Sequence, residues 1–161
     1  MASEYPAAGL VLSEEARAAI AQHGEATYPN ECVGLLLGTI DAGGKRVAAA
    51  YPVENRWQGQ VELAETDDPT SQRDRFYLDP RDYLRADRAA RAEGLDVIGC
   101  YHSHPDWVAR PSDRDRTGAQ GVGGGPYFSF IIVSVQSGRA VDLQSWLLTA
   151  DGTQFEPEPI I

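Results

Sequence analysis

Two histidines separated by a single residue are the part of this sequence best suited to chemistry. They lie in "YHSHPDWVARPSDRD", residues 101–115, which holds two of the chain's three histidines. Alternate side chains of an extended segment point the same way, so His102 and His104 leave one face and can converge on one metal ion before Pro105 ends the strand. Two imidazoles suit zinc, and a catalytic zinc site adds a third protein ligand while leaving one position for water.

Spacing along the chain narrows the choice of the third ligand without settling it. Asp106 is too close to His104 to reach round the same ion, whereas a turn through "WVARP" brings Asp113 or Asp115 back. Ser112 followed three positions later by an acidic residue also resembles a capping box at a helix start. The two interpretations are compatible, because a helix that begins at Ser112 holds Asp115 on its first turn, facing the histidines.

Composition limits the class of protein. The chain has 161 residues, 24 of them acidic and 14 basic, which gives a formal charge of -10. This charge repels phosphate backbones, so we expect no nucleic acid partner. Cys32 and Cys100 are too few for a disulfide framework, and the sequence shows no basic-then-apolar leader and no long apolar run. We expect a single domain over residues 1–161, in the cytoplasm, with reduced thiols and no membrane contact.

The first half predicts a helix, a pair of strands and a long loop. After a polar leader, Ser13 can cap a helix that carries two glutamates in its first turn and ends near residues 28–30. The apolar run "CVGLLLGTI" fits a strand buried on both faces, and "RVAAAYPV" returns beside it. Residues 54–78 have no sustained period and several carboxylates, which predicts an acidic loop that either covers the cleft over bound substrate or is a surface insertion.

The second half predicts a second helix and three more strands. Asp79 and Pro80 start a helix over residues 80–93, with Gly94 as its left-handed cap. "DVIGCY" reads as a buried strand leading to His102, and "FSFIIVSV" and "AVDLQSWLLT" form an antiparallel ribbon. A short helix is expected after the histidine loop. The fold class is therefore α/β, with helices packed on a mixed central sheet and the site at the carboxyl end of a central strand.

The complete spacing resembles that of a known family. His102, His104, Ser112 and Asp115 give His-x-His-x7-Ser-x2-Asp, and "NECVGLLLG" supplies Glu31 upstream. This combination resembles the JAMM (MPN+) zinc metallopeptidases, over most of the chain from about residue 13 to 146, and most of all their small bacterial and archaeal members.

The resemblance implies a role for each of these residues. His102, His104 and Asp115 bind one zinc ion per chain, Glu31 on a strand acts as general base and then acid, and Ser112 donates a hydrogen bond to the oxyanion. The implied fold is the single-domain cytidine-deaminase-like α-β-α layer. The implied activity is hydrolysis of a peptide or isopeptide bond after the C-terminal Gly-Gly of a ubiquitin-like, sulfur-carrier protein.

Three other functions have to be distinguished from this one. A non-catalytic MPN-type scaffold would have lost metal ligands, and none is lost here. A JAMM amidase that acts on another small peptide substrate would use the same chemistry, so the sequence leaves that alternative open. The sequence also leaves the oligomeric state open. A zinc deaminase would need a Pro-Cys-x-x-Cys motif, which this sequence lacks. We expect Cys32 and Cys100 in the core, although Cys100 could instead be a fourth ligand of a closed structural site. His23 is expected to face solvent, and Trp146 to pack.

Overall fold

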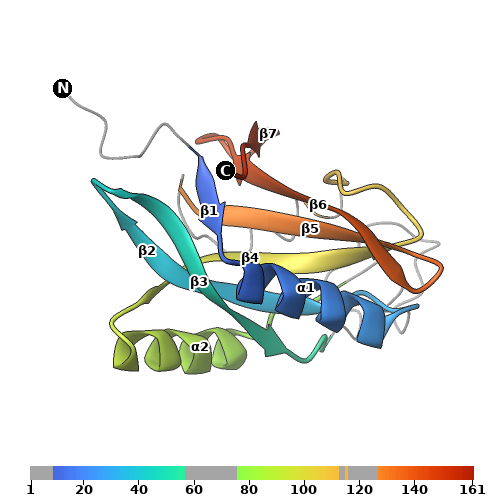
Figure 1. Ribbon diagram of the computed structural model, residues 1–161, viewed down its shortest axis with the longest axis horizontal. Coiled ribbons are helices and arrows are strands. Elements are labelled where there is room, and N and C mark those ends of the chain that lie inside the picture. The colour runs from blue at the N-terminus through green and yellow to red at the C-terminus, as the bar shows by residue number, and fades with distance from the viewer. Residues whose placement is uncertain (1–8, 57–75, 113–114, 116–126) are drawn as a thin grey trace.

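The chain folds into a seven-stranded mixed sheet with two helices (Figure 1). The computed structural model describes residues 9–56, 76–112, 115 and 127–161. The sheet order is β1-β3-β2-β4-β5-β6-β7, so β4, which carries both histidines, is the central strand. The elements are β1 (Leu10–Leu12), α1 (Glu14–Thr27), β2 (Val33–Asp41), β3 (Gly44–Val53), α2 (Pro80–Ala92), β4 (Asp96–Pro105), β5 (Ser129–Gln136), β6 (Arg139–Leu148) and β7 (Phe155–Glu158).

The register of the central strands positions the site. β2 and β3 form the expected antiparallel hairpin, and β4 runs antiparallel to β2 with His102 opposite Val33. On its other side β4 is parallel to β5, where His104 lies opposite Ser134. Strand pairing therefore holds the backbone of His102 on both sides and that of His104 on the β5 side, and the predicted mixed α/β sheet is confirmed. The cytidine-deaminase-like name for its layers stays a prediction.

Both faces of the sheet are buried, each under its own helix. On β2, Leu36 packs in the cluster that includes Ala16 and Ile20 of α1, whereas Leu35 and Leu37 pack with α2 on the other face. This alternation explains why "CVGLLLGTI" is apolar without interruption. Cys32 and Cys100 lie in these clusters, and burial raises the pKa of the Cys32 thiol to about 12, so the prediction that both are core residues is confirmed.

The predicted helix boundaries are also confirmed. The Ser13 hydroxyl accepts the Ala16 N–H at the start of α1. Asp79 caps α2 in the same way by accepting from Arg81 N, Pro80 follows in the first turn, and Gly94 takes a φ of +73° just past the end. None of the helices in the described part of the chain is long and apolar enough to cross a membrane.

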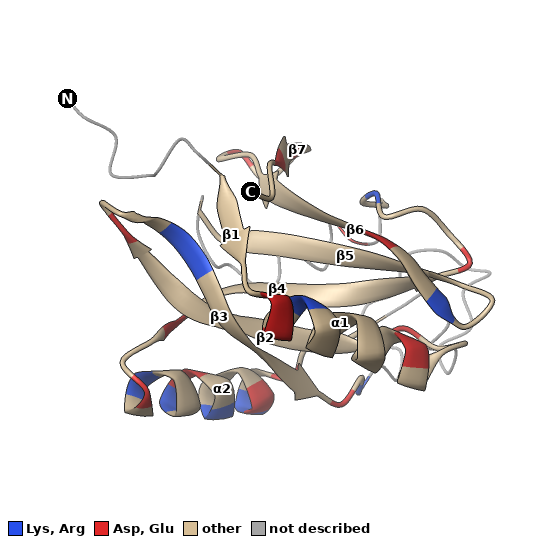
Figure 2. Cartoon of the chain, viewed as in Figure 1, with Lys and Arg blue, Asp and Glu red and all other residues tan. Residues whose placement is uncertain are grey.

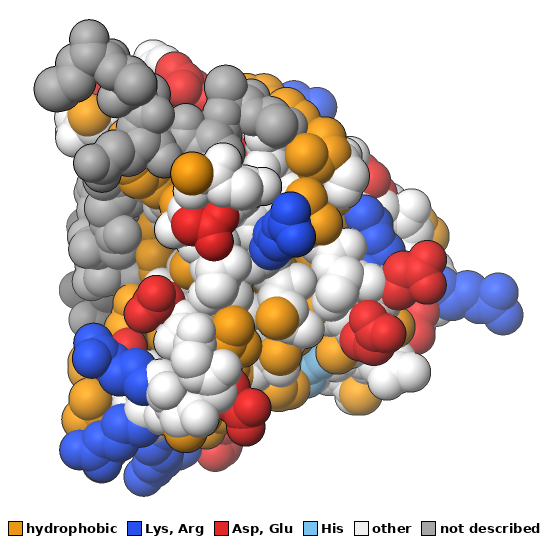
Figure 3. Space-filling view, turned by 60° about the vertical axis from the view of Figure 1, so that its left-hand side comes forward, with side chains coloured by type: hydrophobic (Ala, Val, Ile, Leu, Met, Phe, Trp, Pro, Cys, Tyr) orange, Lys and Arg blue, Asp and Glu red, His pale blue; other side chains and the backbone are white. Residues whose placement is uncertain are grey.

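Basic and acidic residues lie close to one another along α2 (Figure 2), and some of them form ion pairs. Arg81 binds Asp79 at 2.8 Å, and Arg91 binds Asp87 at 3.0 Å one turn away. The space-filling view shows basic side chains beside acidic ones on this side of the molecule (Figure 3). The most arginine-rich element of the described chain is therefore largely compensated.

Two strands were missed by the sequence analysis. The expected polar leader contains β1, which pairs in parallel with β3, and the last residues contain β7, which pairs with β6. Leu10 also bridges Ile160, with Leu10 N donating to Pro159 O at 2.8 Å and Ile161 N donating to Leu10 O at 2.9 Å. The sheet thus curls until its two edges meet. With 3 and 4 residues, these strands are too short to show a period of two.

Three other predictions concern the loops and His23. The short helix after the histidine loop lies outside the described residues except for Ser112 and Asp115, and most of the acidic segment 54–78 lies outside them as well. The expectation that His23 faces solvent is wrong, because its Nδ1 lies 2.8 Å from the Tyr101 hydroxyl. Partial burial in this contact lowers the pKa of His23.

A buried ion pair connects the two sides of the curl. Lys45 of β3 and Glu158 of β7 meet at 2.8 Å, and their side chains are 0% and 1% exposed. Glu158 also accepts hydrogen bonds from the hydroxyls of Ser129 at 2.6 Å and Ser145 at 2.7 Å. A carboxylate removed from water is stable only when it is paired and hydrogen-bonded, and here three strands, β3, β5 and β6, supply the partners.

Removing the cation tests this cluster. We expect Lys45→Met to lower the free energy of unfolding by about 3–5 kcal/mol, because the Glu158 carboxylate stays buried without its partner. The control, Arg46→Met, alters the exposed neighbour on the same strand and is expected to change stability by less than about 0.5 kcal/mol. Urea unfolding measures both, and equal effects would contradict a stabilising role for the pair.

Candidate metal centre

The two histidines lie side by side at the carboxyl end of β4. His102 is 3% exposed and His104 is 5% exposed, and their Nε2 atoms are 3.2 Å apart. Tyr101 packs in the cluster on the α1 side, so the alternating histidines point to the opposite face, the side of α2 and Cys100. The predicted convergence of His102 and His104 on one point is confirmed.

Asp115 completes a triangle with the two imidazoles. Its Oδ1 lies 3.0 Å from His102 Nε2, and its Oδ2 lies 2.9 Å from His104 Nε2. Ser112 N donates to Asp115 Oδ2 at 2.8 Å, and Asp115 N donates back to Ser112 Oγ at 3.2 Å. This reciprocal pair is the predicted capping box, and it aims the carboxylate at the histidines. Asp113 lies outside the described residues.

The His104 tautomer and the ionised Asp115 carboxylate suit the binding of a cation. His104 Nδ1 lies 2.8 Å from the Val108 carbonyl, which can only accept, so in the neutral ring Nε2 presents a lone pair to Asp115. Burial lowers the pKa of His102. Burial alone would raise the pKa of Asp115, but the contacts with both histidines outweigh it and hold that pKa well below its usual range. An ionised carboxylate beside two imidazole nitrogens is a set of groups that can bind a cation.

The size of the triangle fits zinc. Tetrahedral coordination with bonds of about 2.0–2.1 Å places ligand atoms about 3.3 Å apart. Here the two imidazole nitrogens are 3.2 Å apart, and each lies 2.9–3.0 Å from a different oxygen of Asp115, distances that a small expansion brings to that value. Two imidazoles and one carboxylate are also a ligand set that zinc takes in catalytic sites. The residues present therefore fit a zinc ion.

Glu31 joins the same cluster. One ligand atom from each of Glu31, His102, His104 and Asp115 lies within 4.8 Å of the others, and all four residues are buried. The expectation that Glu31 lies on a strand is wrong, because Glu31 lies two residues before the start of β2. Its backbone is held from outside the sheet, because Asn55 Nδ2 donates to the Glu31 carbonyl at 3.0 Å. Neighbouring Cys32 N donates to Ser103 Oγ at 2.8 Å.

Aromatic rings contact both histidines. The Phe76 ring stacks on His102 with centroids 4.5 Å apart and an interplanar angle of 23°. Trp107, 47% exposed, lies with its ring 5.0 Å from that of His104. Trp146 packs in the core, as expected, with Nε1 donating to Ala109 O. The contacts of Phe76 and Asn55 with the site could not be recognised from the sequence, because nothing in the local pattern of either residue indicates a contact with residues so far along the chain.

In the described chain, neither Asp106 nor Cys100 joins the group of possible metal ligands. Asp106 turns away from the triangle, where its carboxylate accepts the Tyr28 hydroxyl at 2.6 Å and Ser137 N at 2.8 Å. Burial raises the pKa of Cys100, and this thiol is not a member of the four-residue group found in the described chain. The arrangement is therefore a site with three nearby nitrogen and oxygen donors and a carboxylate beside them.

Comparison with known proteins places this geometry in a family. Residues 13–149 match the family of prokaryotic homologs of the JAB domain. The chain belongs to this family. The resemblance to the small prokaryotic JAMM/MPN proteins is thereby confirmed.

Three individual relatives are similar to this chain over more than half of its length. Desampylase of Haloferax volcanii is 32% identical over 71% of this chain and 75% of its own. The probable TtuB-protein conjugate cleaving protease of Thermus thermophilus is 32% identical over 65% of this chain and 56% of its own. The solution structure of a protein from Salinibacter ruber is 38% identical, with a TM-score of 0.67 over 94% of this chain and 90% of that one.

Metal binding by the prokaryotic JAB domain can be tested ligand by ligand. We expect His104→Ala and Asp115→Ala to weaken zinc binding by at least about 100-fold, because losing even an outer-shell partner costs about 10–100-fold. Asp113→Ala is the matched control and is expected to keep one ion per chain, as is Cys100→Ser. Competition with a chromophoric chelator measures the affinities. Equal losses for Asp113 and Asp115 would refute the assignment of the third ligand, and loss with Cys100 would indicate a closed site.

Proposed function

We propose that this protein is a zinc-dependent hydrolase that cleaves a peptide or isopeptide bond after the C-terminal Gly-Gly of a ubiquitin-like protein. The observation that carries the proposal is the buried group of His102, His104, Asp115 and Glu31 in a chain of the prokaryotic JAB-domain family. Three of these residues suit a metal ligand set, and the fourth is a carboxylate placed beside it.

His102, His104 and Asp115 are the proposed ligands of one zinc ion. When bound, zinc acts as a Lewis acid that lowers the pKa of water to about 7. The chain holds its ligands in the form that binding needs. The Val108 carbonyl fixes the His104 tautomer, and the capping box with Ser112 fixes the Asp115 carboxylate.

Glu31 is the proposed general base and acid. Its carboxylate takes a proton from the attacking water and passes it to the leaving amine as the C–N bond breaks. The products are then a free Gly-Gly carboxylate and an amine. A glutamate only 3% exposed, beside a proposed metal ligand set, has little structural reason to be there as an incidental core residue.

Ser112 is the proposed oxyanion donor. Its Oγ accepts the Asp115 N–H, so the hydroxyl hydrogen is not used in that bond and can be donated to a substrate oxygen. Preorganised donors of this kind stabilise the charge that develops in the transition state. The same residue thus orients a ligand through its backbone N–H and serves the substrate through its side chain.

The names of two relatives support the proposed substrate class. One relative is named for desampylation and another for cleaving TtuB-protein conjugates, and we infer a ubiquitin-like, sulfur-carrier substrate for this chain. An extended tail ending in two glycines can approach closer to a buried site than a tail with side chains. A cytoplasmic carrier conjugate is the partner that this proposal requires.

Replacing Glu31 separates catalysis from folding and metal binding. We expect Glu31→Gln to keep its zinc and melting temperature but to lower kcat by at least about 100-fold, because the amide is nearly isosteric and cannot accept the proton. Glu15→Gln, on the exposed side of α1, is the control and is expected to keep wild-type kcat. A Glu31→Gln enzyme with wild-type turnover would exclude the proposed base.

A substrate panel tests the proposed reaction. We expect the zinc-loaded protein to release a fluorescent amine from the Gly-Gly terminus of a ubiquitin-like carrier, and chelation of the zinc to abolish release. Replacing the last glycine by alanine is expected to reduce kcat/KM sharply. No cleavage of any carrier would favour the scaffold, and equal cleavage of short unrelated peptides would favour the amidase.

A further inference from the structure

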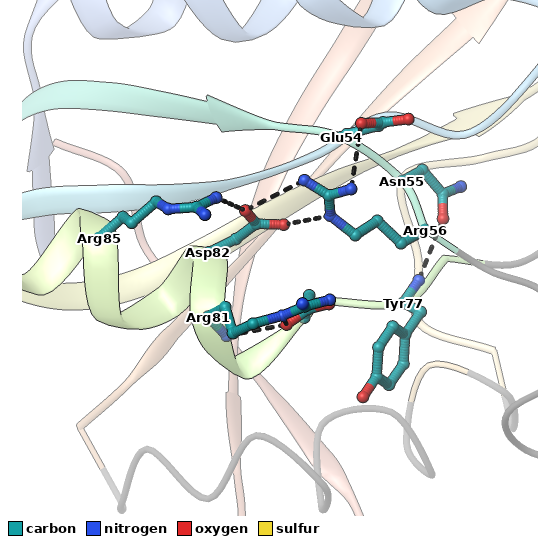
Figure 4. Close-up of polar contacts among 8 residues, drawn as sticks. Glu54, Asn55, Arg56, Tyr77, Arg81, Asp82 and Arg85 are labelled. Atoms are coloured by element: carbon teal, nitrogen blue, oxygen red, sulfur yellow. Dashed lines mark hydrogen bonds and ion pairs between the residues drawn. The ribbon is translucent and has the colours of Figure 1, made fainter.

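Asn55 connects two parts of the candidate site. It follows β3, is 9% exposed, and uses both ends of its carboxamide. Nδ2 donates to the Glu31 carbonyl at 3.0 Å, and Oδ1 accepts Tyr77 N at 3.1 Å. Figure 4 shows the second of these bonds, beside the ion pairs of Arg56. One side chain therefore connects two backbone segments far apart in the sequence.

The first segment carries the proposed base. Glu31 precedes β2, which begins at Val33, so the sheet ladder does not fix its carbonyl. Asn55 binds that carbonyl, while Ser103 Oγ accepts Cys32 N at 2.8 Å from the other side. Because a side chain extends from its backbone, these contacts, with Ser103 N donating to Cys32 O at 3.3 Å, set the position from which the Glu31 carboxylate reaches the cluster.

The second segment supports a proposed ligand. Tyr77 follows Phe76, whose ring stacks on His102 at 4.5 Å. Holding Tyr77 N against Asn55 therefore also holds Phe76 against the imidazole. The carboxamide spans the distance between the base and the ring that packs on a metal ligand.

Only an amide side chain supplies both bonds at this position. Asparagine offers one donor group and one acceptor on a short planar end, whereas an ionised aspartate of the same shape accepts but cannot donate. An aspartate here would keep the Tyr77 bond and face the Glu31 carbonyl with negative charge. An alanine would lose both bonds.

We propose that Asn55 is a positioning residue, which sets the Glu31 carboxylate and the Phe76–His102 stack relative to each other. This inference rests on the proposed function, because it assigns Asn55 a purpose in that reaction. It predicts that disturbing Asn55 lowers the rate of the chemical step more than it weakens substrate binding, since a misplacement of about 1 Å can cost on the order of 100-fold in rate.

Kinetics of matched variants test the proposal. We expect Asn55→Asp to lower kcat at least about tenfold with KM within about threefold and one zinc ion retained. The control is Arg56→Lys, which weakens the neighbouring 2.8 Å ion pair to Asp82 without touching Glu31 and is expected to keep wild-type kcat. Unchanged kcat in Asn55→Asp, or an equal loss in Arg56→Lys, would overturn the proposal.

Amide hydrogen exchange on the zinc-loaded protein gives a readout that does not depend on turnover. We expect Asn55→Asp to speed exchange at Cys32 but not at Tyr77, Asn55→Ala to speed both, and Arg56→Lys to speed neither. Unchanged protection of Cys32 in Asn55→Asp would overturn the positioning role. If the wild-type protein cleaves no carrier, the proposed function fails, and the exchange pattern still decides whether Asn55 holds the Glu31 segment.

Discussion

The buried contact of His102 and His104 with the Asp115 carboxylate is the interaction on which the rest of the site depends: the two imidazole Nε2 atoms are 3.2 Å apart, and each lies 2.9–3.0 Å from a carboxylate oxygen. Much of the surrounding structure serves to hold these groups there. Pairing with β2 and β5 holds the backbone of His102, pairing with β5 holds that of His104, and a reciprocal capping box orients the Asp115 carboxylate.

The two faces of β4 divide the work between packing and chemistry. Tyr101 points into the cluster under α1, and the intervening histidines point toward the site. Ser103 also belongs to the packing side, yet its hydroxyl reaches back to Cys32 N, next to Glu31. Alternation along a single strand therefore places the proposed ligands on one face and a brace for the proposed base on the other.

Sequence reasoning located the central strands, both helices and the convergence of the histidines, because each rests on local periodicity or capping. The capping box at Ser112 was also visible, since its two residues are three positions apart. Local patterns could not reveal β1 and β7, whose pairing joins distant parts of the chain, nor the contacts of His23, Asn55 and Phe76. Those contacts depend on register and tertiary approach, which one sequence does not encode in any short window.

The meeting of Leu10 with Ile160 has a consequence for the order of assembly on the ribosome. The segment from Glu31 to Asp115 contains every proposed site residue, and it emerges well before Ile160 does. Contacts between residues so distant in sequence form late, because the intervening chain must first be ordered. During synthesis the histidine end of the sheet can therefore form before the two edges of the sheet meet. The Lys45–Glu158 ion pair, which joins β3 to β7, forms only after the last strand has been made.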